Sequence, residues 1–548
     1  MIRRPSLFLL VIIAMVADAT VLCQAQPQTL LTHHVRDVVV NGHAPFVGRL
    51  PASQSMRIDI VLALRDRAGL DSFLAELYDP TSPSYRQFLT VEQFTEKFGP
   101  SQKDYDALTR FAAANGFAVV GGSRDALDVQ LKGSVAAIET AFHVTMGIFH
   151  DPVEDRDFYA PDREPTVDLP FQLWHISGLD NYSIPRPALL RRPPGARSEA
   201  TTGSCPSQSF CGSDMRAAYY EGTSLTGKGQ YIGLLEYAGF DIVDVNLYYK
   251  NAKQKRYAPV KGISTDGTNI NCYANQNCDD TEQTIDITQA LGMAPRVKKL
   301  LVYVGSTDTA LLGAMSSDQP LPLNLSSSWG WSPPDPTTDD PYFEKMASQG
   351  QSFLQAAGDS GAWKNQKMWW PEESQYVICV GGTVLTTKGP GKGWASETVW
   401  QYGGGGISPD GIPIPSWQKL KGVINKKNEG SKKYRNGPDV SANSNQSFYV
   451  CADQTGGCSA NLYGGTSFAA PMWAGYLALA NEQAAAKGDN PPGFINPAIY
   501  PLGLGKGYHT DFHDITSGSN GFPAVPGYDL ATGWGTPNKS GLINALAP

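Results

Sequence analysis

The stretch Gly464-Gly465-Thr466-Ser467-Phe468-Ala469-Ala470-Pro471 leads from a loop into an apolar segment that continues to Ala480. Its small residues predict a buried helix, whose positive dipole end would lie at the hydroxyl groups. Glycine at such a turn lets a substrate backbone approach closely. The stretch therefore fits either a nucleophilic Ser467 or a helix capped by a Ser or Thr, and the presence of a base decides between them.

Histidine is the usual base for a serine nucleophile, but its distribution argues against that role here. The 8 histidines are His33, His34, His43, His143, His150, His175, His509 and His513. A subtilisin-type triad needs a histidine upstream of its serine. Because no histidine lies between Ile176 and Tyr508, the base is expected to be a carboxylate.

Two carboxylates open a predicted helix over 281–293. Glu282 and Asp286 are four residues apart, so both project from one face. A solvated acidic face is the ordinary interpretation, but Ile285 and Leu291 indicate a largely buried helix. Two close carboxylates in a partly dry site have their pKa values pushed apart. One is then available as a base while the other holds a proton.

A third acid, Asp359, lies in Ala356-Ala357-Gly358-Asp359-Ser360-Gly361, after a helix expected over 341–357. An Asp-turn is one interpretation. The other is a protonated acid that donates a hydrogen bond to the oxyanion formed when Ser467 attacks an amide.

The region around these residues alternates strands with helices. The expected strands are 230–235, 298–304, 323–327 and 376–380, and the expected helices are 281–293 and 341–357. This order predicts an α/β fold with a doubly wound, mostly parallel sheet and helices on both faces. In such sheets the functional groups lie beyond the carboxyl ends of the strands.

The preceding residues, 26–183, predict a separate α+β unit. Its expected strands are 57–64, 127–131 and 144–149, and its expected helices are 66–77, 92–98, 101–115 and 134–142. A β-α-β-β-α-β order of this kind is typical of a ferredoxin-like domain.

Residues 184–203 form a Pro-rich, basic linker of the kind that proteases cut. Residues 1–25 have the charges and apolar run of a secretory signal peptide. Together with a larger unit over 204–548, this organisation predicts an exported zymogen. Acid is expected to protonate carboxylates between the two units and loosen their contact.

Composition excludes several classes of protein. The 548 residues carry a net charge of −8 and a pI near 5.6, which argues against nucleic acid as a partner. No apolar run is long enough to span a membrane easily. A secreted monomer that acts on polypeptides is expected.

The cysteines fit an oxidising compartment. They form three close couples, Cys205 with Cys211, Cys272 with Cys278 and Cys451 with Cys458. Cys379 is left over inside an apolar run and is expected to be a buried free thiol, while Cys23 would leave with the signal peptide.

The motifs together resemble those of the sedolisin (serine-carboxyl) peptidases. The matching segments are Glu282 to Asp286, 356–361, 465–471, 213–219, 327–330 and 380–383. Residues 82–90 and 96–99 resemble the pro-kumamolisin activation domain of that family. The resemblance implies a subtilisin-like fold, and an activation domain that inhibits the peptidase within the same chain until it is cut off.

The resemblance also implies roles for individual residues. Ser467 would be the nucleophile, Glu282 the general base and Asp286 the residue that orients it, and Asp359 would line the oxyanion hole. Glu236 and Trp329 would extend the acid network. With unperturbed carboxyl pKa values near 4, an ionised Glu282 beside a protonated Asp359 would be natural only at roughly pH 3 to 5.

The C-terminal segment contains a candidate metal site. Asp514 and Asp529 flank an irregular Gly/Pro loop, and carboxylates with carbonyl groups suit Ca²⁺. A loop closed by Asx-turns is the alternative. The family resemblance favours calcium, with Asp514 and Asp529 as side-chain ligands. Its carbonyl ligands would be those of Ile515, Val525 and Gly527.

Three other functions remain open from the sequence. The chain could be a catalytically inactive secreted binding protein on the same fold, although all four catalytic positions are occupied. A subtilisin-type protease would need a distant histidine. An acid glycosidase that used Glu282 and Asp286 would leave the Ser467 turn unexplained.

Overall fold

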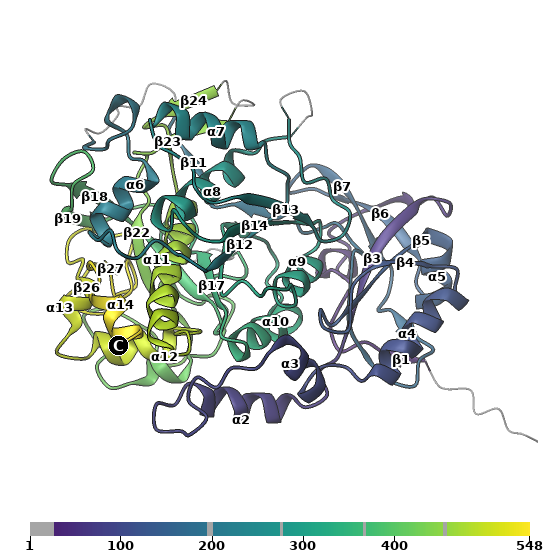
Figure 1. Ribbon diagram of the computed structural model, residues 1–548. Helices are drawn as coiled ribbons and strands as arrows, with labels where there is room; N and C mark the ends of the chain where they lie inside the picture. The colour runs from purple at the N-terminus through teal and green to yellow at the C-terminus, as the bar shows by residue number, and fades with distance from the viewer. Residues whose placement is uncertain (1–26, 194–200, 274–277, 365–368, 453–456) are drawn as a thin grey trace, which may run out of the picture.

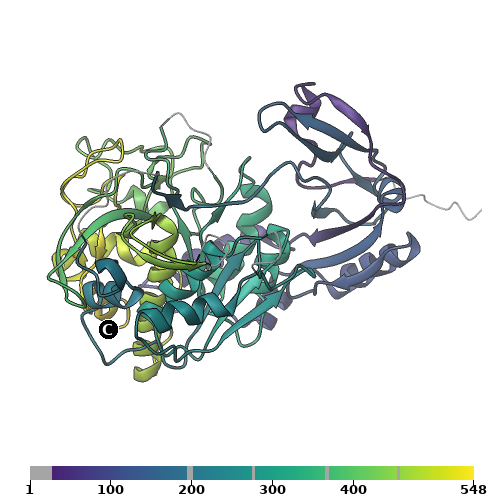
Figure 2. The same ribbon diagram turned by 90° about the horizontal axis from the view of Figure 1, so that it is seen from above.

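The computed structural model describes residues 27–193, 201–273, 278–364, 369–452 and 457–548. The predicted signal peptide, Cys23 and part of the predicted linker lie outside these ranges. Figures 1 and 2 show two units side by side, a smaller N-terminal one in purple to blue and a larger one in teal to yellow. Each unit has its own hydrophobic core.

The N-terminal unit contains a four-stranded antiparallel sheet in the order β4-β5-β3-β9. The strands are β3 (Ser55–Leu62), β4 (Ala118–Gly121), β5 (Asp128–Ser134) and β9 (Leu173–Ser177). With α4 (Gln102–Ala114) and α5 (Val135–Phe142) in the connections, this is the strand order of a ferredoxin-like fold. Residues 144–149, expected as the fourth strand, instead fall largely in β6 (Met146–Asp151), which pairs with β2 (Phe46–Arg49) and β7 (Arg156–Pro161) in a second sheet.

A helical arm of the N-terminal unit, formed by α2 (Arg67–Leu77) and α3 (Val91–Lys97), packs beneath the larger unit (Figure 1). Thr90 caps α3 through a capping box with Gln93. The arm's leucine and phenylalanine side chains join the core of the larger unit rather than that of their own. The arm also contributes an ion pair between Arg67 and the buried Glu344 at 3.0 Å. The two units therefore share a packed, partly charged interface.

The larger unit is built on a sheet in the order β13-β14-β12-β15-β17-β18-β19, with β22 also paired to β18. All its pairings are parallel except that of β18 with β19. The strands are β12 (Tyr231–Glu236), β13 (Val260–Ser264), β14 (Lys299–Val304), β15 (Asn324–Ser327), β17 (Ser352–Ala356), β18 (Ile378–Thr387), β19 (Trp394–Val399) and β22 (Val440–Asn443). The α/β prediction is confirmed.

One element of this sheet differs from the prediction. The helix expected over 341–357 ends earlier, since α10 spans Pro336–Ser348 and a turn at Gly350, with φ of +77°, separates it from β17. All five residues of β17 are buried at the centre of the sheet. A short, fully buried strand has no polar face, so periodicity does not distinguish it from a buried helix.

Helices cover both faces of the sheet (Figure 1). On one face α8 (Thr281–Met293) packs against α11 (Thr466–Lys487), and on the other α9 (Asp308–Met315) packs against α10. Nearly every residue of α8 is buried, including its polar ones. The helix is therefore placed by packing on all sides rather than by one apolar stripe.

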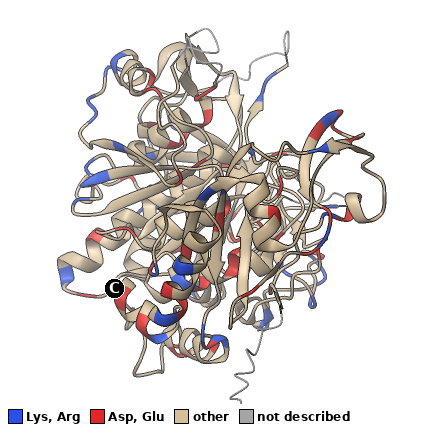
Figure 3. Cartoon of the chain, turned by 90° about the vertical axis from the view of Figure 1, so that its right-hand side faces the viewer, with Lys and Arg blue, Asp and Glu red and all other residues tan. Residues whose placement is uncertain are grey.

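Three disulfides join the cysteine couples expected from the sequence, and Cys379 is free and buried. No helix in the described ranges is long and apolar enough to cross a bilayer. On the side shown in Figure 3, basic and acidic residues are interspersed, with no continuous basic band.

Candidate active site

The carboxyl ends of three neighbouring parallel strands place the polar groups of the site. Strand β12 ends at Glu236, β15 ends just before Ser328, and β17 ends three residues before Asp359. Because parallel strands end at the same edge of the sheet, these groups lie together. The first turn of α11 brings Ser467 to the same edge.

Gly465 makes room for a chain segment at the start of α11. Its φ of +152° is one that L side chains rarely adopt. A Cβ atom at this position would lie 2.4 Å from the carbonyl oxygen of Ala188 and 2.5 Å from Oδ2 of Asp359. The glycine thus allows the backbone at Ala188 to approach both Ser467 and Asp359.

The segment around Ala188 lies across the site in an extended conformation. Upstream, β10 (Arg186–Pro187) pairs antiparallel with β16 (Trp329–Gly330), and the Ala188 N–H donates to the Ser328 carbonyl at 2.8 Å. Downstream, β11 (Leu190–Arg191) pairs with β25 (Tyr463–Gly464). Strand pairing on both sides of one residue is the way in which an extended peptide is bound through its main chain.

The Ala188 carbonyl meets Ser467 directly. The Ser467 hydroxyl donates to this oxygen at 2.5 Å, and the Ser467 backbone N–H donates to it at 3.3 Å. Ser467 is itself fully buried beneath the segment. The carbonyl carbon of Ala188 therefore lies next to a hydroxyl group, with its oxygen already in contact with a backbone donor.

The carboxyl groups of α8 lie behind Ser467. Ser328 Oγ donates to Asp286 Oδ1 at 2.8 Å, and Trp329 Nε1 donates to Glu236 Oε2 at 2.8 Å. Neither oxygen of Glu282 has a hydrogen-bond partner among the described residues, because the Ser467 hydroxyl points to Ala188. Asp286 and Glu236 are thus each held by one donor, whereas Glu282 accepts no hydrogen bond from the described residues.

Burial sets the protonation of this network. Desolvation raises the pKa of Glu282 well above its usual range, the nearby charges of Glu236 and Asp359 raise it further, and the proximity of the Ser467 and Ser328 hydroxyls lowers it. Desolvation likewise raises the pKa of Asp286, and that of Glu236 to about 8. The clustered carboxyls therefore retain protons well above the pH at which exposed ones ionise.

Asp359 is held so that one oxygen is free. Its Oδ1 accepts hydrogen bonds from the backbone N–H of Thr466 at 2.8 Å and from the Thr466 hydroxyl at 2.9 Å. Its buried Oδ2 has no partner in the described part of the chain. Desolvation raises the pKa of Asp359 to about 8, so at acid and neutral pH this oxygen carries a proton to donate.

Some of these residues were not predicted as parts of the site. Ser328 and Thr466 hold Asp286 and Asp359, yet only their places within short motifs marked them in the sequence. No histidine is among the described residues that line the cavity beside Ala188 and Asp359. His513 stacks on Trp394, with ring centroids 4.1 Å apart, in the C-terminal region. The arrangement does not fit a histidine-based triad.

The predicted calcium ligands converge on one loop. Gly527 N–H donates to Asp514 at 3.2 Å, and Val525 N–H donates to Asp529 at 3.0 Å. The carbonyl oxygens of Ile515, Val525 and Gly527 accept no hydrogen bond from the described residues. Neither carboxylate forms an ion pair with a described side chain, and burial raises the pKa of Asp529 to about 7. Asp529 Oδ1 also accepts hydrogen bonds from the N–H groups of Ala531 and Thr532, which is the arrangement of an Asx-turn. Carboxyl groups and free carbonyls are also the ligand types that Ca²⁺ takes, so the calcium site stays a prediction.

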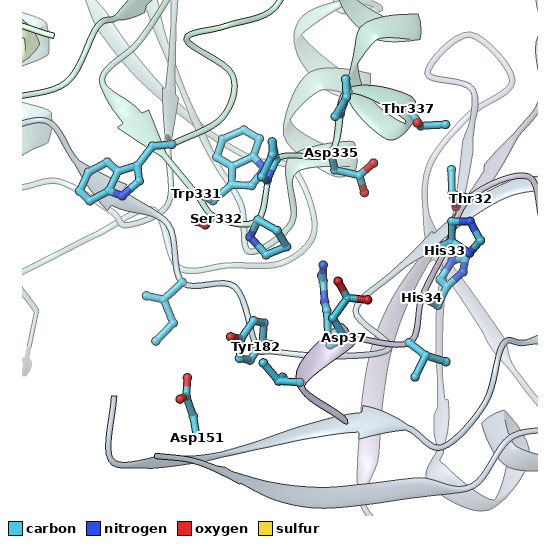
Figure 4. Close-up of a pocket in the computed structure, with 18 of the residues that line it drawn as sticks. Thr32, His33, His34, Asp37, Asp151, Tyr182, Trp331, Ser332, Asp335 and Thr337 are labelled. Carbon is cyan, nitrogen blue, oxygen red and sulfur yellow. The ribbon is translucent and has the colours of Figure 1, made fainter. Parts of the chain in front are cut away.

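A cavity of about 750 Å³ separates the two units near the site (Figure 4). Thr32 and His34 of the N-terminal unit lie on one side, and Asp335 and Thr337 at the start of α10 lie on the other. His34 stacks on His175 with ring centroids 4.5 Å apart.

The carboxyls of this interface do not fit the hypothesis that acid loosens it by protonating them. Desolvation raises the pKa of Asp128 to about 6 and that of Asp308 to about 6. A group whose pKa rises on folding stabilises the folded state at low pH and loses that contribution as the pH rises. His175 has the opposite sign, because burial lowers its pKa well below the usual value and the folded state resists its protonation. His175 is therefore a group of this interface whose protonation would oppose the folded arrangement.

Comparisons with known proteins agree with these observations. Residues 43–181 match the pro-kumamolisin activation domain, and residues 272–491 match the subtilase family. The chain is 30% identical to kumamolisin of Bacillus sp. (strain MN-32), a similarity that covers 93% of this chain and 96% of the relative. It is 26% identical to sedolisin of Pseudomonas sp. (strain 101), over 90% of this chain and 86% of the relative.

A solved structure supports the fold. It is Pseudomonas sedolisin, a serine-carboxyl proteinase complexed with two molecules of pseudo-iodotyrostatin. The TM-score is 0.51 at 24% identity, and the match covers 64% of this chain and 98% of that chain.

Proposed function

Since this chain belongs to the sedolisin (serine-carboxyl peptidase) family and is a serine peptidase with an activation domain, we propose that Ser467 is its nucleophile and Glu282 its general base. Asp286 orients Glu282, and Asp359 donates to the oxyanion. The observation that carries the proposal is the 2.5 Å contact between the Ser467 hydroxyl and the Ala188 carbonyl oxygen.

The reaction follows from this contact. Ser467 Oγ attacks the carbonyl carbon while Glu282 takes the hydroxyl proton. The negative oxygen that forms receives hydrogen bonds from the Ser467 backbone N–H and the protonated Asp359. Glu282 then returns the proton to the leaving nitrogen as the C–N bond breaks, and water hydrolyses the acyl-enzyme with the same base. Ser328 supports the step by fixing Asp286.

The enzyme acts in acid. Glu236 and Asp359, with pKa values of about 8, and Asp340, at about 7, are protonated at acid pH, and the folded state binds these protons more tightly than the unfolded chain does. The fold is therefore most stable in acid and loses stability as the pH rises through 7 to 8. Glu282 must lose its proton before it can act as the base, so its ionisation sets the low-pH limit on activity. Burial beneath the linker raises the pKa of Glu282, and removal of the linker would let water reach the carboxyl and bring that pKa back toward the acid range.

The zymogen processes itself between Ala188 and Leu189. The segment 186–191 fills the cleft as a substrate would, so the N-terminal unit inhibits the enzyme until this bond is cut. The chain continues in both directions from that bond and is strand-paired on each side of it, through β10 and through β11. This supports endopeptidase activity on polypeptides.

The remaining features complete the proposal. The enzyme is secreted, as the leader sequence and three disulfides indicate, and functions as a monomer. Asp514 and Asp529, with the carbonyls of Ile515, Val525 and Gly527, hold a Ca²⁺ ion that stabilises the C-terminal loops.

The test is hydrolysis of a denatured protein at acid pH by the wild type and by Ser467→Ala and Glu282→Ala. Removal of the nucleophile is expected to lower kcat by about 10⁶-fold, and removal of the base by at least 10²- to 10⁴-fold. Full activity in either variant contradicts the assigned roles.

A further inference from the structure

A small cavity beside the scissile bond contains a carboxyl group that the reaction does not use. The cavity, of about 150 Å³, is lined by Ala188 and Leu189 of the linker, by Asp359, and by Glu372. We propose that this cavity binds the side chain of the residue on the amino side of the cleaved bond, and that Glu372 selects a lysine or an arginine there. The proposal rests on the proposed function and names its preferred substrates.

Strand pairing directs that side chain toward Glu372. In the antiparallel pair of β10 and β16, Arg186 lies opposite Gly330, and Ala188, two residues further, points to the same side of the ribbon. On that side a Cβ atom at Gly330 would lie 3.2 Å from Glu372 Oε1. The side chain at position 188 therefore points toward the cavity that Glu372 also lines.

Two glycines lie close to the Glu372 carboxyl, and Gly358 also lines the cavity. Glu372 Oε1 is 3.2 Å from the Cβ position of Gly330 and 3.8 Å from that of Gly358. A Cβ atom at Gly330 would also lie 2.7 Å from the Cβ atom of Trp369, so the Trp369 side chain borders the Glu372 carboxyl on that side, while Gly358 lines the cavity without a side chain. Ala188, which also lines the cavity, carries only a methyl group as its side chain.

Glu372 lacks the partner that a buried carboxyl requires. The residue is 1% exposed, and its Oε2 has no hydrogen-bond partner among the described residues. Burial, with Glu373 and Asp359 nearby, raises its pKa well above the usual value. An unpartnered buried polar group costs free energy, and a donor inserted from the substrate would remove that cost.

The surroundings favour a cation over a neutral donor. The titratable residues that line the cavity in the described part of the chain are Asp359 and Glu372, so the lining contributes no positive charge, and a cation inserted beside Glu372 would favour the ionised form of its carboxyl. Trp363 and Trp369 also line it, and indole faces attract ammonium and guanidinium groups. A lysine or arginine side chain would extend past these rings and pair with Glu372. The alanine present in the linker does not make this contact, so the zymogen presents a poor version of the preferred sequence.

The test compares peptides that differ only at the residue before the cleaved bond, with Lys, Arg, norleucine or Ala there. For the wild type, kcat/KM is expected to be about 10- to 100-fold higher for Lys and Arg than for norleucine. Glu372→Gln should remove this preference and keep the activity on the Ala peptide. Glu373→Gln is the matched control, because Glu373 accepts a hydrogen bond from Ser408 instead, and it should keep the preference.

A second measurement uses the full chain. Ala188→Lys should process itself faster than the wild type, and Ala188→Met should not. Equal rates for Lys and norleucine peptides in the wild type, or an unchanged preference in Glu372→Gln, overturn the assignment of Glu372. Hydrolysis of the Ala peptide distinguishes a failure of the Glu372 assignment from a failure of the proposed function. If the wild type does not hydrolyse the Ala peptide, the proposed function itself is contradicted.

Discussion

Asp359 offers a test in which one atom is changed and the pH dependence reports the result. Its Oδ1 is held by Thr466, and its buried Oδ2 is free to donate to the oxyanion. Asp359→Ala removes this donor, which is expected to lower kcat by about 10²- to 10³-fold, or about 2.7–4 kcal/mol. Asp359→Asn accepts the same two bonds from Thr466 and offers an amide N–H in place of the acid proton. A smaller loss is expected for Asn.

The pH profile separates the two kinds of donor. The wild type should lose kcat as the pH rises through about 8, because Asp359 then loses its proton and adds a negative charge beside the oxyanion. Asp359→Asn has no proton to lose at this position, so its profile should lack that limb. The assay is the initial rate on a fluorogenic peptide between about pH 3 and pH 9. Recovery of activity on return to acid pH controls for unfolding. Wild-type kcat in Asp359→Ala, or the same alkaline limb in Asp359→Asn, refutes the oxyanion role.

Three further predictions concern stability and activation. Ca²⁺ at about 100 times its Kd should stabilise the protein by about 2.7 kcal/mol. Calorimetry should show that a chelator removes this stabilisation from the wild type, whereas the stability of Asp529→Asn should not depend on calcium. Tm should fall as the pH rises toward about 8, since the raised pKa values of Glu236 and Asp359, both about 8, stabilise the fold only while these groups are protonated. A Tm that rises over this range would contradict these protonation states. His175→Phe keeps a ring against His34 but takes no proton, so its self-processing should require a lower pH than that of the wild type. Gels of the chain incubated at different pH values measure this, and an unchanged pH of activation would exclude His175 as the acid-sensitive group.

Much of the site could be predicted because its chemistry is local in sequence. Glu282 and Asp286 lie one helical turn apart, so any helix through them brings their carboxyls together. The turn before Ser467 likewise carries its glycine and hydroxyl in consecutive positions. Placing Asp359 beside them required the family resemblance, because nothing in the spacing of residues 286 and 359 fixes their distance in space.

The misassigned elements share a physical cause. Strand β17 is buried on both faces, so its five residues carry no alternation of polar and apolar side chains. The last strand of the N-terminal sheet, β9, follows a second sheet that is inserted after α5. Local patterns do not reveal which of two later strands returns to the first sheet.

The functions of Ser328 and Glu372 come from tertiary contacts. Ser328 is marked in the sequence only by a Ser-Ser-Trp-Gly motif, and its bond to Asp286 joins segments 42 residues apart. Glu372 lies in a Trp-Pro-Glu-Glu stretch that the sequence does not connect with the cleft. The position of Ala188 over Ser467 also depends on strand pairing that no linear pattern predicts.

The most direct test of the account is the mass of the first fragments formed when the purified zymogen is acidified and quenched early. We expect an N-terminal fragment that ends at Ala188 and a partner that begins at Leu189, with neither formed by Ser467→Ala. A first cut elsewhere in the chain, or the same cut in Ser467→Ala, would contradict the claim that Ser467 attacks the carbonyl group it contacts.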